Sequence, residues 1–293
     1  MRILCIGEAM AEVRKTAGGF AVGFAGDTYN TAVYCRRAMA GGAVGYLTRV
    51  GQDPLSDGFM QSALGEGLDL AHVARDTDAN IGIYTVQTDA MGERSFAYWR
   101  SQSAARGLFQ SPADFAALTG ADILYLSGIT LAILAPEARA ALIGHLAQLR
   151  AKGQRVAFDS NYRPRLWPDL ATAQRAIAAA WAQCDIALPS VDDEMALFGD
   201  ADAPAVVTRL RAMGLCCGAV KQGAMGPLAI NPATPAQTYA PAARVVDTTA
   251  AGDSFNGAYL AALAGGAGDA AALRAGHEMA AHVVGHAGAI VPK

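Results

Sequence analysis

The sequence predicts an α/β fold in which a mostly parallel sheet is flanked by helices and a smaller sheet lies beside it. Short runs rich in Ile, Val and Leu alternate with longer amphipathic segments, which is the pattern of β-α-β units. Two other segments alternate apolar and polar residues around turn signals, which is typical of antiparallel hairpins. With 293 residues, the chain is long enough for one large domain rather than several modules.

The apolar runs predicted as core strands are residues 3–7, 123–128, 155–159, 184–190 and 218–223. Helices are predicted between the last four, in residues 136–153, 169–183 and 193–214, because their apolar residues recur at helical spacing. The hairpin-like segments are residues 8–24, with a turn at Gly18-Gly19, and residues 80–101, with a turn at 89–92. We expect residues 1–293 to form a single domain that carries both segments as insertions.

The composition indicates a protein that acts on a small molecule. The net charge is −3 and no run is rich in Lys or Arg, so nucleic acid is not an expected partner. The first apolar run ends at Glu8, which makes it too short for a signal sequence or a membrane span. The five cysteines include no C-x-x-C pair, which favours a reducing compartment. We therefore expect a cytoplasmic protein with no membrane contact.

The segment Asp247–Leu260, DTTAAGDSFNGAYL, carries the most specific chemical signal. Its small residues Ala250, Ala251 and Gly252 lead into an apolar helix, so the backbone can approach a ligand closely. The free N–H groups at such a helix start bind anions. Two roles are open for Asp253: it can cap the helix, or its carboxylate can take a proton from an alcohol during phosphoryl transfer.

This segment resembles the C-terminal signature of the ribokinase-like (PfkB) sugar kinases over all fourteen of its residues. The resemblance implies a Rossmann-like domain with a small β-sheet lid, which corresponds to the insertions at 8–24 and 80–101. It also implies ATP with Mg²⁺ as the phosphoryl donor, Asp253 as the catalytic base and residues 250–253 as the anion hole. It leaves open a monovalent cation such as K⁺ near Asp247 and Thr249, and assembly into a homodimer or a higher homo-oligomer.

A second segment, KQGAMG at residues 221–226, is similar to the K-x-G-x-x-G loop near the nucleotide in this family. The resemblance assigns Lys221, Gly223 and Gly226 to nucleotide binding, together with Gly252. Taken alone, such a segment is more often a simple turn between strands. The chain contains no G-x-x-x-x-G-K motif, which excludes a P-loop enzyme.

The family's N-x-x-E motif, which organises Mg²⁺ and phosphate, is altered in this chain. Ser190 stands where the family has Asn, and we assign it to nucleotide binding. By spacing, Asp193 takes the acidic position, and Glu194 is its rival as the residue that holds Mg²⁺. The alternative is that these acids simply interact favourably with the dipole at a helix start.

Near the N-terminus, FAGDTYN at residues 24–30 resembles the family's G-G-D-x-x-N substrate segment, with Ala25 in place of the first Gly. Asp27 and Asn30 offer hydrogen-bonding groups that suit vicinal sugar hydroxyls, and Gly26 lets the backbone approach the sugar. Without the distal signature, a turn followed by a helix cap would explain the same residues.

Two arginines indicate the class of sugar. Arg100 ends a predicted strand and shares a face with Tyr98, whereas Arg163 follows the core strand 155–159, where a parallel sheet places its site. Two guanidinium groups aimed at a sugar match a carboxylate. Both segments resemble those of 2-keto-3-deoxygluconate kinases, and this resemblance assigns substrate binding to Gly26, Tyr84, Tyr98, Arg100 and Arg163.

These resemblances imply ATP-dependent phosphorylation of 2-keto-3-deoxygluconate to its 6-phosphate, with Asp253 as the general base. One alternative is a ribokinase-like kinase for a neutral sugar such as fructose, in which Arg100 and Arg163 have structural roles. Another is a non-catalytic sugar-binding protein on the same fold. The complete run at 250–253 disfavours this last alternative.

Overall fold

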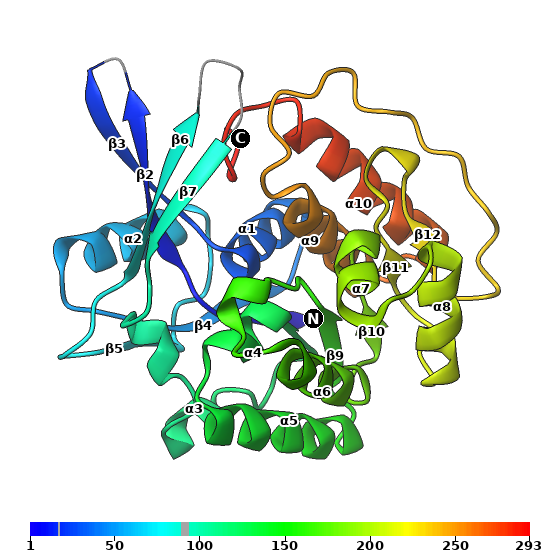
Figure 1. Ribbon diagram of the computed structural model, residues 1–293, viewed down its shortest axis with the longest axis horizontal. Helices are drawn as coiled ribbons and strands as arrows, with labels where there is room; N and C mark the ends of the chain where they lie inside the picture. Colours follow the sequence, from blue (N-terminus) through cyan, green and yellow to red (C-terminus); the bar gives the residue numbers. More distant parts are fainter. Residues whose placement is uncertain (17, 89–93) are drawn as a thin grey trace.

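The computed structural model describes residues 1–16, 18–88 and 94–293. Its centre is a six-stranded sheet in the order β10-β9-β8-β1-β4-β5, with every neighbouring pair parallel (Figure 1). The strands are β1 (Arg2–Ile6), β4 (Ala43–Val50), β5 (Val73–Arg75), β8 (Ile123–Ser127), β9 (Arg155–Asp159) and β10 (Ile186–Ala187). The predicted α/β fold class is confirmed.

Helices cover both faces of this sheet, and successive residues of each central strand alternate between the two layers. Leu4 and Leu124 pack on the face that carries α4 (Gly128–Ile133), α5 (Pro136–Ala151) and α6 (Leu170–Trp181). Ile3 and Ile123 pack on the face that carries α1 (Asp27–Ala38), α9 (Ala251–Ala264) and α10 (Asp269–Val283). Burial on both faces explains why these strands form continuous apolar runs in the sequence. None of the helices in the described part of the chain is long and apolar enough to cross a membrane.

The α-helices have the following bounds: α1 (Asp27–Ala38), α2 (Pro54–Gly65), α3 (Pro112–Ala116), α4 (Gly128–Ile133), α5 (Pro136–Ala151), α6 (Leu170–Trp181), α7 (Val191–Phe198), α8 (Ala203–Ala212), α9 (Ala251–Ala264) and α10 (Asp269–Val283). Short 3₁₀ turns span η1 (Ala104–Gly107), η2 (Pro164–Leu166) and η3 (Gly223–Met225). The predicted helical segment 193–214 comprises α7 and α8, which are separated at Gly199.

The predicted core strand at 218–223 differs from the observed structure. β11 (Ala219–Val220) pairs antiparallel with β12 (Leu228–Ala229) in a separate two-stranded ribbon. Isolated parallel bridges connect this region to the end of the main sheet, one between Gly218 and Ala187 and one between Lys221 and Ser190. Gly218 permits the first bridge, because a Cβ there would lie 1.9 Å from the carbonyl oxygen of Ala187.

The two inserted segments form a four-stranded small sheet in the order β3-β2-β6-β7, which stands away from the main sheet in Figure 1. Its strands are β2 (Met10–Thr16), β3 (Gly19–Ala25), β6 (Gly82–Thr88) and β7 (Arg94–Trp99). The outer pairs are antiparallel, as predicted, but β2 and β6 pair in parallel because both run outward from the body. The turn predicted at 89–92 lies outside the described residues.

Candidate active site

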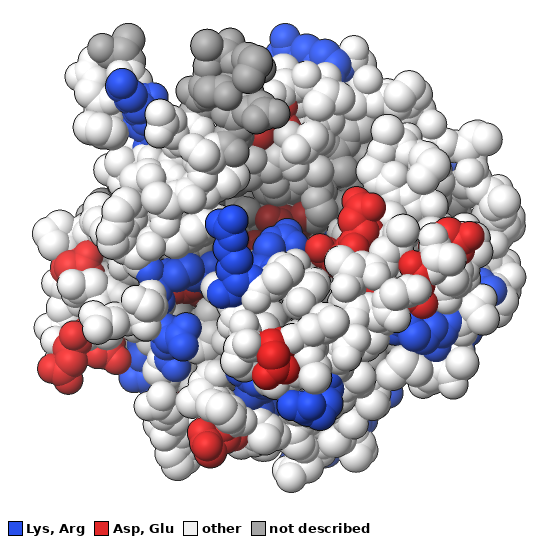
Figure 2. Space-filling view, in the orientation of Figure 1, with Lys and Arg blue, Asp and Glu red and all other residues white. Residues whose placement is uncertain are grey.

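A cavity of about 860 Å³ lies between the small sheet and the carboxyl ends of the main strands. Figure 2 shows a hollow near the middle of this face, bordered by basic and acidic side chains. The predicted site residues that line the cavity are Gly26, Asp27, Asn30, Tyr84, Tyr98, Arg100, Arg163, Ser190, Lys221, Ala250, Ala251, Gly252 and Asp253. The fold thus brings together residues from both ends of the chain.

The first turn of α9 forms one wall of this cavity. Ala250 precedes the helix in a left-handed conformation, with φ of 59°, and turns the chain so that the helix start faces the cavity. The amides of Gly252 and Asp253 belong to the first turn, where α-helix geometry provides no intrahelical acceptor for an N–H group. The wall therefore offers N–H donors and the positive end of the helix dipole to an anion.

Asp253 lies beside these amides and is bound by a residue of α1. Nδ2 of Asn30 donates a hydrogen bond of 2.9 Å to Oδ2 of Asp253. Burial raises the pKa of Asp253 to about 7, and the negative charge of Asp27 acts in the same direction, whereas the Asn30 amide and the charge of Lys221 oppose both. A carboxyl group in this pKa range can accept a proton near neutral pH.

Behind Asp253 lies a buried polar network that the sequence did not indicate. Nζ of Lys221 donates to Oδ2 of Asp159 at 2.5 Å and to Oδ1 of Asn256 at 3.0 Å. Nδ2 of Asn256 donates in turn to Asp159 and to the hydroxyl of Tyr125, at 2.7 and 3.0 Å. Two features of the sequence could have identified these residues: Asn256 lies three residues after Asp253, and Asp159 ends a core strand, β9.

Lys221 also lies close to the start of α9. A Cβ on Gly252 would lie 3.4 Å from Nζ of Lys221, so the absence of a side chain lets the ammonium group approach the helix start. The positive charge of Lys221 therefore adds to the anion-binding character of this wall. Gly223 and Gly226 lie in and after the η3 turn and are not among the described residues that line the cavity.

Asp27 is oriented by residues of two other elements. Oδ2 of Asp27 accepts hydrogen bonds from Oγ of Ser127, at 2.5 Å, and from Nδ2 of Asn161, at 2.9 Å. Ser127 ends β8, and Asn161 follows β9 with a positive φ of 32°. The carboxylate of Asp27, a predicted substrate-binding residue, is therefore held at the carboxyl ends of two parallel strands, where α/β folds bind ligands.

The opposite side of the cavity comes from the small sheet and its junction with the body. The ring of Tyr84 stacks on that of Tyr98 at 5.8 Å, and its hydroxyl donates to the carboxylate of Glu12. Nη2 of Arg100 donates to Oε2 of Glu8. The sequence did not indicate Glu8, which also lines the cavity and is 1% exposed.

Arg163 enters the cavity from the main sheet. Its side chain is 51% exposed, and Nη1 donates to Oδ1 of Asp193 at 3.1 Å. Burial raises the pKa of Asp193 above its ordinary value, and the charge of Arg163 opposes that shift. Asp193 is not among the described residues that line the cavity, but its partner Arg163 is.

The other candidate metal ligand, Glu194, has a different environment. Its carboxylate is buried and accepts a hydrogen bond of 2.5 Å from Nη2 of Arg209. It is not among the residues lining the cavity. Within the described residues, no group of three or more His, Cys, Asp or Glu side chains could enclose a metal ion.

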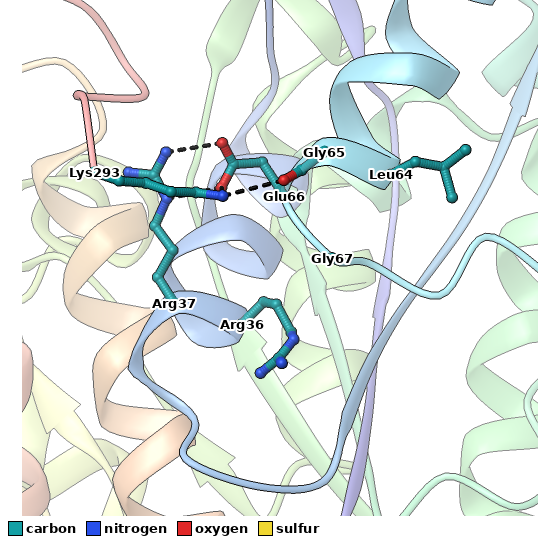
Figure 3. Close-up of a pocket in the computed structure, with 7 residues that line it drawn as sticks. All are labelled: Arg36, Arg37, Leu64, Gly65, Glu66, Gly67 and Lys293. Atoms are coloured by element: carbon teal, nitrogen blue, oxygen red, sulfur yellow. Dashed lines mark hydrogen bonds and ion pairs between the residues drawn. The ribbon is translucent and has the colours of Figure 1, made fainter.

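A second cavity, of about 500 Å³, lies at the ends of α1 and α2 (Figure 3). Arg37 and Lys293 both bind the carboxylate of Glu66 there, at 2.8 and 3.4 Å, and Nη1 of Arg36 donates to the carbonyl of Met39. Arg37 and Lys293 therefore share one carboxylate, whereas the partner of Arg36 is a neutral carbonyl.

The model of the pfkB family carbohydrate kinases matches residues 2–293. The chain belongs to this family. Among pfkB relatives, it is 39% identical to 2-dehydro-3-deoxygluconokinase of Escherichia coli K12, covering 100% of this chain and 97% of that enzyme. It is 40% identical to the enzyme of the same name from Dickeya dadantii, covering 99% and 96%.

The fold agrees with solved structures of the pfkB family. The crystal structure of a PfkB protein from Polaromonas sp. JS666 superposes with a TM-score of 0.85 and 27% identity, covering 98% of this chain and 96% of that chain. Membership in the pfkB family identifies the chain as a carbohydrate kinase.

Proposed function

We propose that this protein phosphorylates 2-dehydro-3-deoxygluconate, also called 2-keto-3-deoxygluconate, at its 6-hydroxyl with ATP as donor. The observation that carries the proposal is one cavity with Asp253 beside a helix start on one wall and two arginines, Arg100 and Arg163, on its other sides. The names of the relatives at 39% and 40% identity support the same substrate.

In this proposal Asp253 is the general base. Its carboxylate borders the cavity, and the Asn30 amide fixes its orientation. With a pKa of about 7, it is partly unprotonated at neutral pH and can accept the proton of the sugar hydroxyl as that oxygen attacks. Asp27, held by Ser127 and Asn161, and the backbone of Gly26 position the sugar.

Stabilisation of the transferred phosphoryl group falls to the backbone and to Lys221. Residues 250–253 line the cavity at the positive end of α9, and the N–H groups of Gly252 and Asp253, which have no intrahelical acceptor, would stabilise developing negative charge without reorganising. Lys221 adds a buried positive charge that Asp159 and Asn256 hold in place. Ser190, which lines the same cavity, would contact the nucleotide.

ATP in this family is accompanied by a divalent cation, which we take to be Mg²⁺. Mg²⁺ keeps several waters and uses few protein carboxylates, so the lack of an acid cluster among the described residues fits this ion. Asp193 would hold it, because its carboxylate contacts Arg163, which lines the cavity, whereas Glu194 is bound to Arg209. When bound, Mg²⁺ neutralises phosphate charge.

The proposal also includes a conformational change and the cellular location of the enzyme. The small sheet acts as a lid that closes over the sugar, since it supplies Tyr84 and Tyr98 to the cavity and Arg100 follows it directly. We place the enzyme in the cytoplasm, because its five cysteines are all free in the structure.

A neutral sugar such as fructose is the second candidate substrate. One observation favours it: both arginines already have carboxylate partners, Glu8 for Arg100 and Asp193 for Arg163. In that case, the ion pairs would be structural and the cavity would recognise hydroxyl groups alone.

A substrate panel separates the two candidates. ADP release is measured with 2-dehydro-3-deoxygluconate, 2-keto-gluconate and fructose under identical conditions. We expect the highest kcat/KM with 2-dehydro-3-deoxygluconate, and a product whose phosphate is on the 6-oxygen by ³¹P NMR. A higher kcat/KM with fructose would overturn the sugar-acid proposal, and no turnover of any of the three would overturn the assignment of the site.

A further inference from the structure

Glu8 lies at the junction between the main domain and the small sheet, and it has no role in the proposed chemistry. The chain passes between the body and the small sheet at residues 7–9, 26, 76–81 and 100–103. Glu8 lies in the first passage, and its carboxylate binds two residues of the last one. Nη2 of Arg100 donates to Oε2 of Glu8, and Oγ of Ser103 donates to Oε1 at 2.5 Å.

The other two passages pack against the same residue. A Cβ on Gly26 would lie 2.3 Å from the backbone oxygen of Glu8, and a Cβ on Gly82, where the third passage enters β6, would lie 2.9 Å from Oε1. Glycine at these positions makes room for the Glu8 backbone and carboxylate. Glu8, which is 1% exposed, therefore packs against the second passage through its backbone and against the start of β6 through its carboxylate.

Arg100 is the only described cation bound to this carboxylate, and it also borders the cavity. Its side chain is 11% exposed, and within the described residues its buried Nε has no hydrogen-bond acceptor. Arg100 thus has donors beyond the one that it gives to Glu8. A sugar carboxylate bound by Arg100 would either share the guanidinium group with Glu8 or replace Glu8 on it.

We propose that Glu8 is a positioning residue that presents Arg100 to the sugar acid, and that Glu8 takes up a proton from solvent when the acid binds. This inference rests on the proposed function, because it requires a carboxylate on the substrate. In the free protein the Glu8 carboxylate is matched by one cation. In the complex, two carboxylates compete for that cation, and the buried one is less able to remain charged.

The surroundings of Glu8 favour this proton uptake. Burial already raises its pKa above the ordinary value, Asp27 at the start of α1 adds to the shift, and Arg100 and Ser103 oppose it. Weakening the contact with Arg100 removes the largest opposing effect. The proton converts the carboxylate to a carboxylic acid, and the Ser103 hydroxyl, which donates to it in the free protein, can then accept its hydrogen bond.

Calorimetry detects the proton directly. Binding of 2-dehydro-3-deoxygluconate is measured without nucleotide in two buffers of equal pH and different ionisation enthalpy, and the difference in heat gives the protons taken up. The absence of nucleotide prevents turnover, and the measurement uses Asp253→Asn because this variant removes the titration of Asp253. The matched variant is Asp253→Asn with Glu8→Gln, because the amide keeps the shape of Glu8 and does not titrate.

We expect Asp253→Asn to take up as much as about one proton per bound sugar. The double variant should lack the part of this uptake that belongs to Glu8. The difference is assigned to Glu8, since Asp193 and Asp27 are unchanged in both proteins. Equal uptake in the two variants, or none in Asp253→Asn, would overturn this inference while leaving the proposed function intact. No binding of the sugar acid by Asp253→Asn would overturn the proposed function as well.

A second measurement avoids dependence on the double variant. If the complex holds more protons than the free protein, the Kd of Asp253→Asn for the sugar acid must increase with pH. Fructose, which has no carboxylate, should show no proton uptake and a Kd that does not change with pH. A Kd for the sugar acid that is independent of pH would overturn the inference.

Discussion

The side-chain amide of Asn30 in α1 donates a hydrogen bond to the carboxylate of Asp253 in α9. The two helices approach closely, because Gly257 leaves room for the backbone of Thr31 and Cys35, which a Cβ would meet at 2.7 Å. The contact thus joins the predicted substrate segment near the N-terminus to the anion-binding segment near the C-terminus.

This contact has a consequence for pH dependence. The pKa of Asp253 is raised to about 7, and a general base must be unprotonated, so we expect kcat/KM to fall as the pH decreases through about 7. Asn30 stabilises the charged carboxylate, so Asn30→Ala should raise the pKa and shift this acidic limb to higher pH. Steady-state profiles of both proteins measure the shift. A limb at the same pH in both would contradict the role given to Asn30.

Asp253→Asn should remove most turnover and leave the binding of sugar and ATP nearly unchanged. The amide keeps the shape of the carboxylate but cannot accept the hydroxyl proton, and a general base contributes about 10²–10⁴-fold. Single-turnover kinetics and calorimetric binding constants separate the two effects. If the variant kept more than about a tenth of the wild-type kcat, a level well above that range, Asp253 would not be the base.

Ala250 has a left-handed conformation, with φ of 59°, which is unfavourable for a residue with a Cβ. We expect Ala250→Gly to increase the free energy of unfolding by about 1 kcal/mol. The matched control is Ala262→Gly in the last turn of α9, which should lower it by up to about 1 kcal/mol. Urea denaturation of both variants gives the values. The same loss of stability in both would show that Ala250 is not strained.

The small sheet should become more protected when sugar binds. If it closes over the cavity, the amides of β2 and β6 gain protection, because closure limits the opening that precedes exchange. Hydrogen exchange with and without 2-dehydro-3-deoxygluconate, in Asp253→Asn, measures this change, and α5 on the far side of the main sheet serves as the internal control. Equal protection of β2 and β6 in both states would argue against a lid.

Much of the fold could be predicted because burial on both faces makes β1, β8 and β9 apolar runs in the sequence. β4 escaped prediction because the polar residues Thr48 and Arg49 interrupt its apolar run. Its Thr48 is buried, and its Arg49 forms an ion pair with Asp114 at 3.3 Å. The parallel pairing of β2 with β6 joins segments about seventy residues apart in the sequence, and no local pattern encodes it.

The candidate site was predictable where its residues are consecutive. The segment 250–253 places the backbone amides and Asp253 together by local geometry alone. The partners of Arg100 and Lys221 could not be predicted in this way, because Glu8 and Asp159 lie 92 and 62 residues away along the chain. Each of those carboxylates ends or follows a core strand, so only the assembled sheet brings them to their cations.

Recognition of a carboxylate is tested most directly by the effects of Arg163→Met and Arg100→Met on two substrates. Losing a charge-assisted hydrogen bond should cost ~1.5–3 kcal/mol, or roughly 10- to 150-fold in kcat/KM for 2-dehydro-3-deoxygluconate. We expect the larger loss for Arg163→Met, whose side chain is on the main sheet side, and little change or a gain in kcat/KM for fructose with either variant. Equal losses on the acid and on fructose would contradict carboxylate recognition and assign both arginines structural roles.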